Sequence, residues 1–284
     1  MPNNLHTMPH DAANHAANKA SNAPTFSIVT CTWNSAATLA DTLASVQNQT
    51  CQDIEHIFVD GGSTDGTLDM IAAYLQDKPG NKRVLRDVGG GISRAMNQGI
   101  EAARGQIIAH LHSDDYYNGP DVLATVKRVF DEQQAAGKPV DWVYGNIQIL
   151  KDGKMVPPYA MPAFSYRSFV AGRSSIPHPA VFIRKTAFER VGSFDEKLKY
   201  AMDIDLWLRL GAVSRPAMID QPLTVFRDHA GSVSSANRIK ARQEEFNVRR
   251  RHMDKAPLAF GIYCLRYLKR LRALQAEARA LAIQ

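Results

Sequence analysis

Segments with the composition of β-strands alternate with segments of helical periodicity between residues 26 and 137, and this alternation limits the fold more than any other feature of the chain. The strand-like segments are apolar and rich in β-branched residues, and each following segment carries apolar residues three or four positions apart. The four strand-like segments are TFSIVTCTW, IEHIFVD, KRVLRD and QIIAHLH. Such alternation predicts an α/β fold with a mostly parallel, Rossmann-like sheet and helices on both of its faces.

Two local features predict where helices begin. Ser35 is expected to cap the helix after the first strand, because its hydroxyl can accept a backbone N–H of the first turn. Pro120 is expected in the first turn of the helix after the fourth strand, where its missing N–H costs no hydrogen bond.

The alternation ends after Gly137. The segments DWVYGNIQIL and KMVPPYA predict a β-hairpin that turns at Asp152 and Gly153, followed by a strand, a short helix and the amphipathic helix DIDLWLRLGAV. From Ile239 onward the pattern is helical and basic, and Pro257 divides it in two. The expected organisation is a disordered tail over residues 1–24, a domain over 25–236 with halves 25–137 and 138–236, and a basic helical extension over 237–284.

Charge is distributed unevenly along the chain. The net charge is +6, yet residues 238–284 contain 12 Lys and Arg against 4 Asp and Glu, which predicts a basic partner surface there. No apolar run reaches the roughly 18 residues that span a bilayer, so an integral membrane protein is not expected. Three scattered cysteines predict neither a disulfide framework nor a zinc site, which favours a reducing, cytoplasmic compartment.

Polar residues follow each of the four predicted strands. These residues are TWN, DGGSTDGT, DVGGG and SDD, and the carboxyl ends of parallel strands are where open sheets bind ligands. The glycines suit the close approach of a nucleotide, but GGGISR lacks the last glycine of the dinucleotide fingerprint and no GxxxxGK[ST] loop occurs. A dehydrogenase and a P-loop ATPase are therefore disfavoured.

Two adjacent carboxylates, Asp114 and Asp115, stand at the end of the fourth strand. A helix cap near Pro120 would explain one of them but not both. A divalent cation held together with a diphosphate explains the pair, because hard cations take carboxylate and phosphate oxygens together.

Five motifs together resemble the family 2 glycosyltransferases of the GT-A fold. They are FSIVTCTWN, VDGGSTDGT, DVGGGISRAMNQGI, AHLHSDDYY and MDIDLWLRL, and the similarity runs from about Phe26 to Ser235. The resemblance implies a metal-dependent, inverting transfer from a UDP-, GDP- or dTDP-sugar to a saccharide acceptor, with Mn²⁺ or Mg²⁺ as cofactor. It also implies a lipid-linked acceptor in polysaccharide or cell-envelope biosynthesis, and no nucleic-acid partner.

The resemblance also assigns roles to residues of the donor half, 25–137. Asp114 would reach the ribose and Asp115 would bind the metal, while the other contacts to the base and ribose would come from Thr30, Asn34, Asp60, Asp87 and Asn97. In many relatives an aspartate stands at the positions of Gly61 and Arg94, so the contacts to base and sugar there differ from the family pattern.

In the acceptor half, 138–236, Asp203 matches the aspartate that serves as general base, although Met202 stands where a glutamate is usual. The alternative is that Asp203 and Asp205 only cap a helix. His229, in RDHAGSVS, would reach the diphosphate or the metal, and His178 lies either near the acceptor or in the core.

The C-terminal extension has two interpretations. It is either a solvated helix packed on the catalytic domain or a basic amphipathic helix on the anionic membrane surface, with Leu258, Phe260, Ile262 and Leu265 entering the interface. The enzyme would then be cytoplasmic and peripheral on the inner face of the membrane. Two other functions stay open: a sugar nucleotidyltransferase, and a catalytically silent nucleotide-sugar-binding protein.

Overall fold

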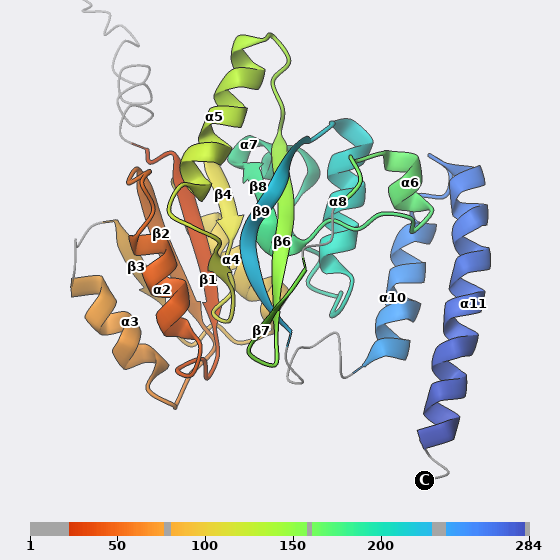
Figure 1. Cartoon of the computed structure of the whole chain (residues 1–284), viewed down its shortest axis with the longest axis horizontal. Helices are drawn as coiled ribbons and strands as arrows, with labels where there is room; N and C mark the ends of the chain where they lie inside the picture. The colour runs from red at the N-terminus through yellow and green to blue at the C-terminus, as the bar shows by residue number, and fades with distance from the viewer. Residues whose placement is uncertain (1–22, 77–80, 158–160, 229–236, 282–284) are drawn as a thin grey trace, which may run out of the picture.

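A single mixed sheet forms the centre of the described molecule (Figure 1). The computed structural model describes residues 23–76, 81–157, 161–228 and 237–281. Within these ranges the strand order is β3-β2-β1-β4-β8-β6-β9-β5, and β7 pairs with β6. The strands are β1 (Phe26–Thr32), β2 (Ile54–Asp60), β3 (Lys82–Leu85), β4 (Ile107–His110), β5 (Tyr116–Tyr117), β6 (Trp142–Lys151), β7 (Lys154–Val156), β8 (Val181–Arg184) and β9 (Ala217–Asp228).

The first four predicted strands pair in parallel, as the alternation predicted. β1 lies between β2 and β4, and its register places Thr32 opposite Asp60, so both strands end at the same edge. Because β1 and β2 are buried along their whole length, they need cover on both faces.

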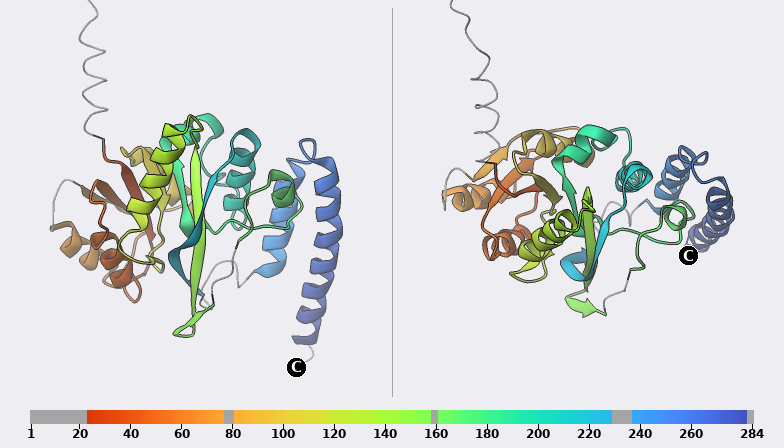
Figure 2. Two further views of the ribbon diagram at one scale, coloured as in Figure 1. Left: turned by 45° about the horizontal axis from the view of Figure 1, so that its top comes forward. Right: turned by 90° about the horizontal axis from the view of Figure 1, so that it is seen from above.

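Helices supply that cover on both sides of the sheet (Figure 2). Val29 and Cys31 of β1 pack with α4 and with the core around α7 and α8, whereas Ile28 packs with α5 and Phe58 with α2 and α3. The helices are α2 (Leu39–Gln47), α3 (Thr67–Gln76), α4 (Ile92–Ala102), α5 (Val122–Ala135), α6 (Tyr166–Val170), α7 (Lys185–Val191), α8 (Met202–Val213), α10 (Arg238–Arg250) and α11 (Pro257–Leu281), with the short 3₁₀ helix η1 (His178–Ala180).

The second half of the sheet is antiparallel in part. The predicted hairpin is confirmed, because β6 and β7 pair across Asp152 and Gly153. β8 runs antiparallel to both β4 and β6, and β9 runs parallel to β6 with irregular register around Asn146. The sequence analysis missed β9, whose apolar residues do not alternate regularly with polar ones.

Both predictions about helix starts were wrong. α2 begins at Leu39 with Thr38 at its N-cap, and the Ser35 hydroxyl instead lies 2.7 Å from the hydroxyl of Ser113. α5 begins at Val122, so Pro120 precedes the helix and its first turn.

The C-terminal extension consists of α10 and α11, which lie side by side at the edge of the molecule formed by α8 and α6 (Figures 1 and 2). Pro257 begins α11, as expected from its position. Val248 of α10 and Tyr263 of α11 are buried, so the extension packs on the domain through an apolar face. Among the described residues, no helix combines the length and apolar character needed to cross a membrane. Most of the predicted tail over residues 1–24 lies outside the described residues.

A buried carboxylate joins the amino ends of the strands. Glu55 of β2, only 1% exposed, accepts hydrogen bonds from the Ser27 hydroxyl (2.5 Å) and the Gly105 N–H (3.0 Å), and it forms ion pairs with Arg83 and Arg104 (2.9 Å each). Burial by itself raises the pKa of Glu55, but these hydrogen bonds and charges outweigh burial and hold the pKa below its usual value. One side chain thus connects β1, β2, β3 and the turn before β4.

Glu55→Gln should destabilise the fold at pH 7 by about 3 kcal/mol, because it leaves two arginines and a dense set of donors without their anion. Since the folded-state pKa is depressed, the stabilisation by Glu55 is present at neutral pH and is lost as pH falls through that pKa. Urea unfolding should therefore show a smaller difference near pH 3.

Glu132→Gln is the matched control, since Glu132 forms an exposed i,i+4 pair with Arg128 that is worth no more than about 0.5 kcal/mol. Equal losses in the two variants at pH 7 would show that the Glu55 network is not a main source of stability.

Candidate active site

Asp60 organises the loop after β2. The side chain is fully buried, and its oxygens accept the N–H groups of Gly62 and Ser63 (2.9 Å each) and the hydroxyls of Ser63 (2.6 Å) and Thr32 (2.8 Å). Burial raises the pKa of Asp60, but these four hydrogen bonds outweigh it and lower the pKa below its usual value. Asp60 is therefore ionised at neutral pH, and its oxygens hold the 60–63 loop in place.

Asn34 connects the loop after β1 to the same segment. Its side-chain oxygen accepts the Thr64 N–H (2.9 Å), and its own N–H donates to the Ser63 hydroxyl (2.9 Å). Its backbone has φ 49°, a left-handed conformation that asparagine tolerates better than most residues. Asn34 is exposed, so it stays available to a ligand at this edge.

Thr30 occupies a different position from the one expected of a pocket residue. It is fully buried within β1, and its hydroxyl lies 2.9 Å from Nε2 of His56. The structure thus places Thr30 in the layer between the sheet and α3, away from the polar edge.

Asp87 and Asn97 also differ from each other in their surroundings. The Asp87 carboxylate lies beside Gly62, with its Oδ1 3.7 Å from the position that a Cβ on this glycine would take. The loop after β3 therefore meets the loop after β2. Asn97 instead accepts the Phe194 N–H (2.9 Å) and donates to the Phe194 carbonyl and to Glu196 (3.0 Å each). Asn97 therefore fastens α4 to the 194–196 loop.

Asp114 and Asp115 lie in a tight turn between β4 and β5. Asp115 is only 1% exposed, its Oδ1 accepts the backbone N–H of Arg227 (3.1 Å), and its carbonyl accepts the Thr42 hydroxyl (2.7 Å). Burial, followed by the charge of Asp114, raises the pKa of Asp115 well above its usual value. Because burial and Asp114 make the ionised form of Asp115 unfavourable, a cation bound beside Asp115 would stabilise that form.

The donor set at this turn suits a hard divalent ion only in part. Carboxylate oxygens are the ligands that Mg²⁺ and Mn²⁺ favour, and two lie here. The described residues contain no cluster of three or more His, Cys, Asp and Glu side chains that could hold a metal ion. The pair therefore fits an ion whose remaining ligands come from a bound diphosphate and water.

Arg227 is a site residue that the sequence analysis missed. It lies at the end of β9, forms an ion pair with Asp41 of α2, and its guanidinium stacks over the Tyr116 ring at 5.2 Å. Its positive charge also lowers the pKa of the neighbouring Asp115, which burial and Asp114 raise. Only the three-dimensional pairing of β9 with β5 brings it there.

Asp203 occupies the first turn of α8, where its Oδ1 accepts the Ile204 N–H (2.7 Å). Burial, assisted by the negative charge of Glu245, raises the pKa of Asp203 to about 6. Asp205 differs, because it pairs with Arg209 (2.8 Å) and with Arg251 (3.3 Å). Of the two, Asp203 has the carboxylate suited to accept a proton near neutral pH.

Glu244 of α10 is a second residue that sequence analysis missed. Its carboxylate accepts the backbone N–H groups of Lys199, Tyr200 and Ala201, immediately before α8. The C-terminal extension therefore fixes the backbone that carries Asp203.

A row of aromatic rings connects α8 with the acidic turn. The His178 ring contacts Trp207 of α8 (5.7 Å between centroids), Phe194 (5.5 Å) and His112 (5.2 Å). Burial lowers the pKa of His112, and the negative charge of Asp114 acts in the opposite direction. Burial, together with His112 and His110, holds the pKa of His178 well below its usual value, so this ring is neutral. His178 thus packs among the aromatic rings between α8 and the acidic turn. His229 lies outside the described residues.

The structure thus combines a mixed α/β sheet, polar loops at the carboxyl ends of its parallel strands and an acidic turn after β4. Residues 27–191 match the model of "Glycosyl transferase family 2", and the chain belongs to that family. It is 35% identical over 202 residues to an uncharacterized glycosyltransferase of Mycobacterium tuberculosis, covering 69% of this chain and 72% of that protein. It is 33% identical over 203 residues to a PGL/p-HBAD biosynthesis glycosyltransferase of Mycobacterium bovis, covering 72% and 75%.

Solved structures agree on the fold, which is GT-A. S. aureus TarS 1-349 in complex with UDP-GlcNAc superposes with a TM-score of 0.64 at 21% identity, covering 79% of this chain and 66% of that chain. A mannosyltransferase of Pyrobaculum calidifontis in complex with GDP-Man and Mn²⁺ gives a TM-score of 0.60 at 17% identity, covering 92% and 81%. The family membership decides against a sugar nucleotidyltransferase, one of the two alternatives raised by the sequence.

Proposed function

We propose that this glycosyltransferase uses a nucleotide-sugar donor with Mn²⁺ or Mg²⁺ and transfers the sugar, with inversion, to a lipid-linked saccharide in polysaccharide or cell-envelope biosynthesis. The observation that carries this proposal is the Asp114–Asp115 pair, in which a buried carboxylate of raised pKa stands next to a second carboxylate. The proposal is also supported by structural neighbours that were solved with UDP-GlcNAc and with GDP-Man and Mn²⁺.

The donor would lie across the carboxyl ends of β1, β2 and β4. Asn34 and the loop held by Asp60 would contact its base and ribose, with Asp87 at the far side and Asp114 on the ribose. Asp115, with Asp114 beside it, would hold the metal, which when bound neutralises charge on the diphosphate. His229, outside the described residues, is proposed to reach the diphosphate or the metal.

Asp203 would act on the acceptor. Its carboxylate would take the proton of the acceptor hydroxyl as that oxygen bonds to the anomeric carbon, while the bond from that carbon to the diphosphate oxygen breaks on the opposite face. Such a single displacement inverts the anomeric centre. Glu244 would keep the base in position by holding the three N–H groups before α8.

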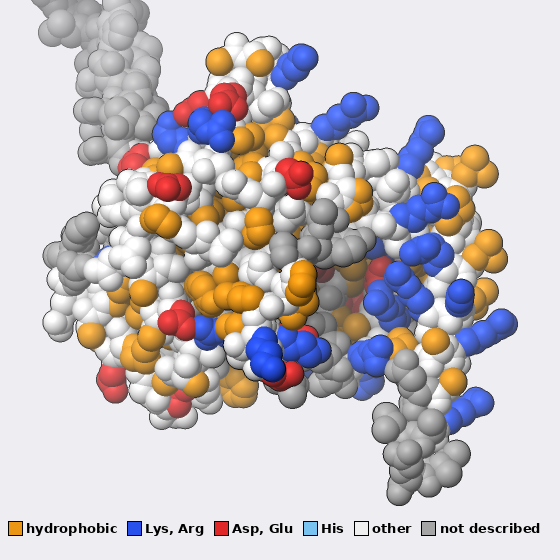
Figure 3. Space-filling model, in the orientation of Figure 1, with side chains coloured by type: hydrophobic (Ala, Val, Ile, Leu, Met, Phe, Trp, Pro, Cys, Tyr) orange, Lys and Arg blue, Asp and Glu red, His pale blue; other side chains and the backbone are white. Residues whose placement is uncertain are grey.

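The outer face of α11 is proposed to contact the anionic membrane that carries the acceptor. Leu258 (87% exposed), Ile262, Leu265 (72% exposed) and Leu268 are exposed along it, and Lys and Arg side chains gather over α10 and α11 (Figure 3). Phe260 does not belong to this face, contrary to expectation, because its ring packs inward against Phe246 (5.7 Å). Apolar side chains flanked by basic ones are what an interfacial helix requires.

Asp115→Asn should remove most metal-dependent donor binding, because the neutral amide cannot replace a carboxylate on a hard cation. We expect calorimetry with Mn²⁺ and UDP-, GDP- and dTDP-sugars to find one donor that binds the parent. The same donor should bind the variant at least tenfold more weakly. The exposed Asp131→Asn serves as control. Unchanged donor binding in Asp115→Asn would assign the metal elsewhere.

Asp203→Asn should retain donor binding and lose transfer by about 10²–10⁴-fold, the usual contribution of a general base. Because the folded-state pKa of Asp203 is raised to about 6, its ionised form destabilises the fold as pH rises through that value. The asparagine variant should therefore be more stable than the parent at pH 8 by about 3 kcal/mol, with little difference at pH 3. Full transfer activity in the variant would exclude Asp203 as the base.

Leu258→Ser combined with Leu265→Ser should abolish co-sedimentation with vesicles of phosphatidylglycerol, since both side chains are exposed and neither contributes to the core. Binding of the parent should weaken with salt, because surface charges are screened beyond about 8 Å at physiological ionic strength. Met155→Ser is the matched control, as Met155 is 53% exposed on β7. Equal sedimentation of all three proteins at low salt would rule out this membrane contact.

A further inference from the structure

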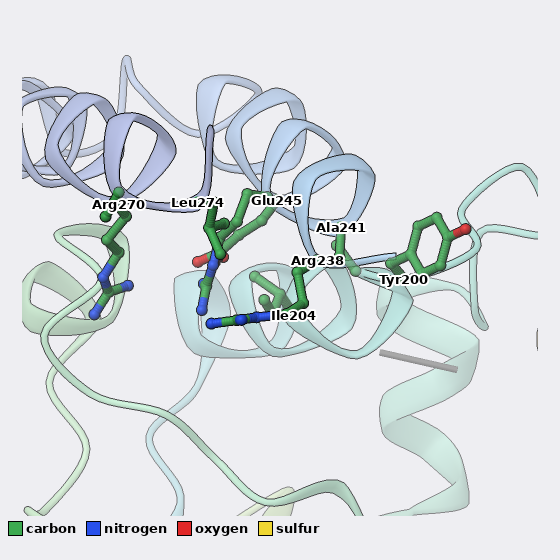
Figure 4. Close-up of a pocket in the computed structure, with 10 residues that line it drawn as sticks. Tyr200, Ile204, Arg238, Ala241, Glu245, Arg270 and Leu274 are labelled. Carbon is green, nitrogen blue, oxygen red and sulfur yellow. Dashed lines mark hydrogen bonds and ion pairs between the residues drawn. The ribbon is translucent and has the colours of Figure 1, made fainter. Parts of the chain in front are cut away.

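A basic cavity lies between α8, α10 and α11, next to the proposed general base. Its volume is about 590 Å³, and Tyr200, Ala201 and Ile204 form the wall on the side of α8. Figure 4 shows Arg238, Glu245 and Arg270 projecting from α10 and α11 toward this space. Ala201 and Ile204 flank Asp203 in the chain, so the cavity adjoins the acceptor side of the site.

Arginines outnumber carboxylates around this cavity. Arg238, Arg242 and Arg270 line it, and Glu245 is the one carboxylate among its lining residues. Glu245 is already paired with two guanidinium groups, those of Arg242 (2.5 Å) and Arg249 (2.8 Å). Glu245 therefore pairs with Arg242 and Arg249, and among the described residues it forms no ion pair with Arg270.

Two arginines of α11 lie near this cavity without a carboxylate at ion-pair distance among the described residues. Within the part of the chain that the structure describes, Arg270 has no hydrogen bond or ion pair, and the buried Nε of Arg266 has no hydrogen-bond partner. Burial, and then the nearby charges of Arg242 and Arg266, lower the pKa of Arg270. Repulsion of this kind between half-buried cations is relieved when an anion binds among them.

We propose that this cavity binds the phosphate or diphosphate group of the acceptor. Guanidinium groups offer paired N–H donors that match phosphate oxygens, and donors from two helices can surround a group with several oxygens. A lone carboxylate fits less well, because it has only two oxygens for guanidinium groups that come from two helices. The inference rests on the proposed function in one respect, that Asp203 marks the acceptor side. A phosphate held here would set the acceptor hydroxyl at a fixed distance from Asp203.

Calorimetry on the full chain, with inorganic pyrophosphate as the probe and EDTA present, tests the cavity without the metal-dependent donor site. Arg270→Gln should weaken pyrophosphate binding about tenfold or more, as expected for loss of a charge-assisted hydrogen bond. Arg272→Gln removes the same charge from an exposed position on the same helix, so it should change binding less than twofold. Arg238→Gln, with the exposed Lys240→Gln as its control, repeats the comparison on α10.

Farnesyl diphosphate should compete with pyrophosphate and farnesol should not, which separates a lipid-borne phosphate from free phosphate. No competition by farnesyl diphosphate would overturn the acceptor assignment. Glucuronate binding as tight as that of pyrophosphate would overturn the preference for phosphate. Equal losses of pyrophosphate affinity in Arg270→Gln and Arg272→Gln would show that pyrophosphate does not bind in this cavity. Donor binding with Mn²⁺ is measured in parallel. Its failure in the parent, with pyrophosphate binding still dependent on Arg270, would reject the proposed function and retain the cavity.

Discussion

The carboxylate of Glu55 is the contact on which the sheet depends most. It lies at the amino ends of the parallel strands, and it gathers a hydroxyl of β1, a guanidinium of β3 and the turn between α4 and β4. Buried carboxylates are stabilising only when their hydrogen bonds are complete, and this one has a full set. With the amino ends joined in this way, the loops at the carboxyl ends can be polar and shaped by ligand binding without loosening the strands.

Much of the fold followed from periodicity. The alternation of strand and helix patterns predicted β1 to β4 with their helices, and the Asp152–Gly153 turn predicted the hairpin. β9 could not be predicted in the same way, because its position beside β6 and β5 depends on pairing between distant segments. Ser35 failed as a predicted cap for a similar reason: a tertiary contact with Ser113 replaced the local hydrogen bond.

The candidate site residues also fall into two groups, those that the local sequence could place and those whose position depends on burial or on distant contacts. Asn34, Asp60 and Asp87 follow strand ends, and the structure brings their loops together. Thr30 lies inside a strand that is buried on both faces, so sequence could not indicate which face it occupies. Asn97 depended on a loop that lies 97 residues further along the chain. The functions of these residues as donor contacts remain predictions.

Glu244 has a consequence for how such enzymes can diversify. The three N–H groups that it accepts precede the helix of Asp203, and the neighbouring residue Glu245 lines the arginine cavity. A chimera that exchanged only the C-terminal hairpin for that of a relative would therefore replace the proposed acceptor contacts and the support of the proposed general base in one step. Recombination between such enzymes should therefore keep α8 and α10 together.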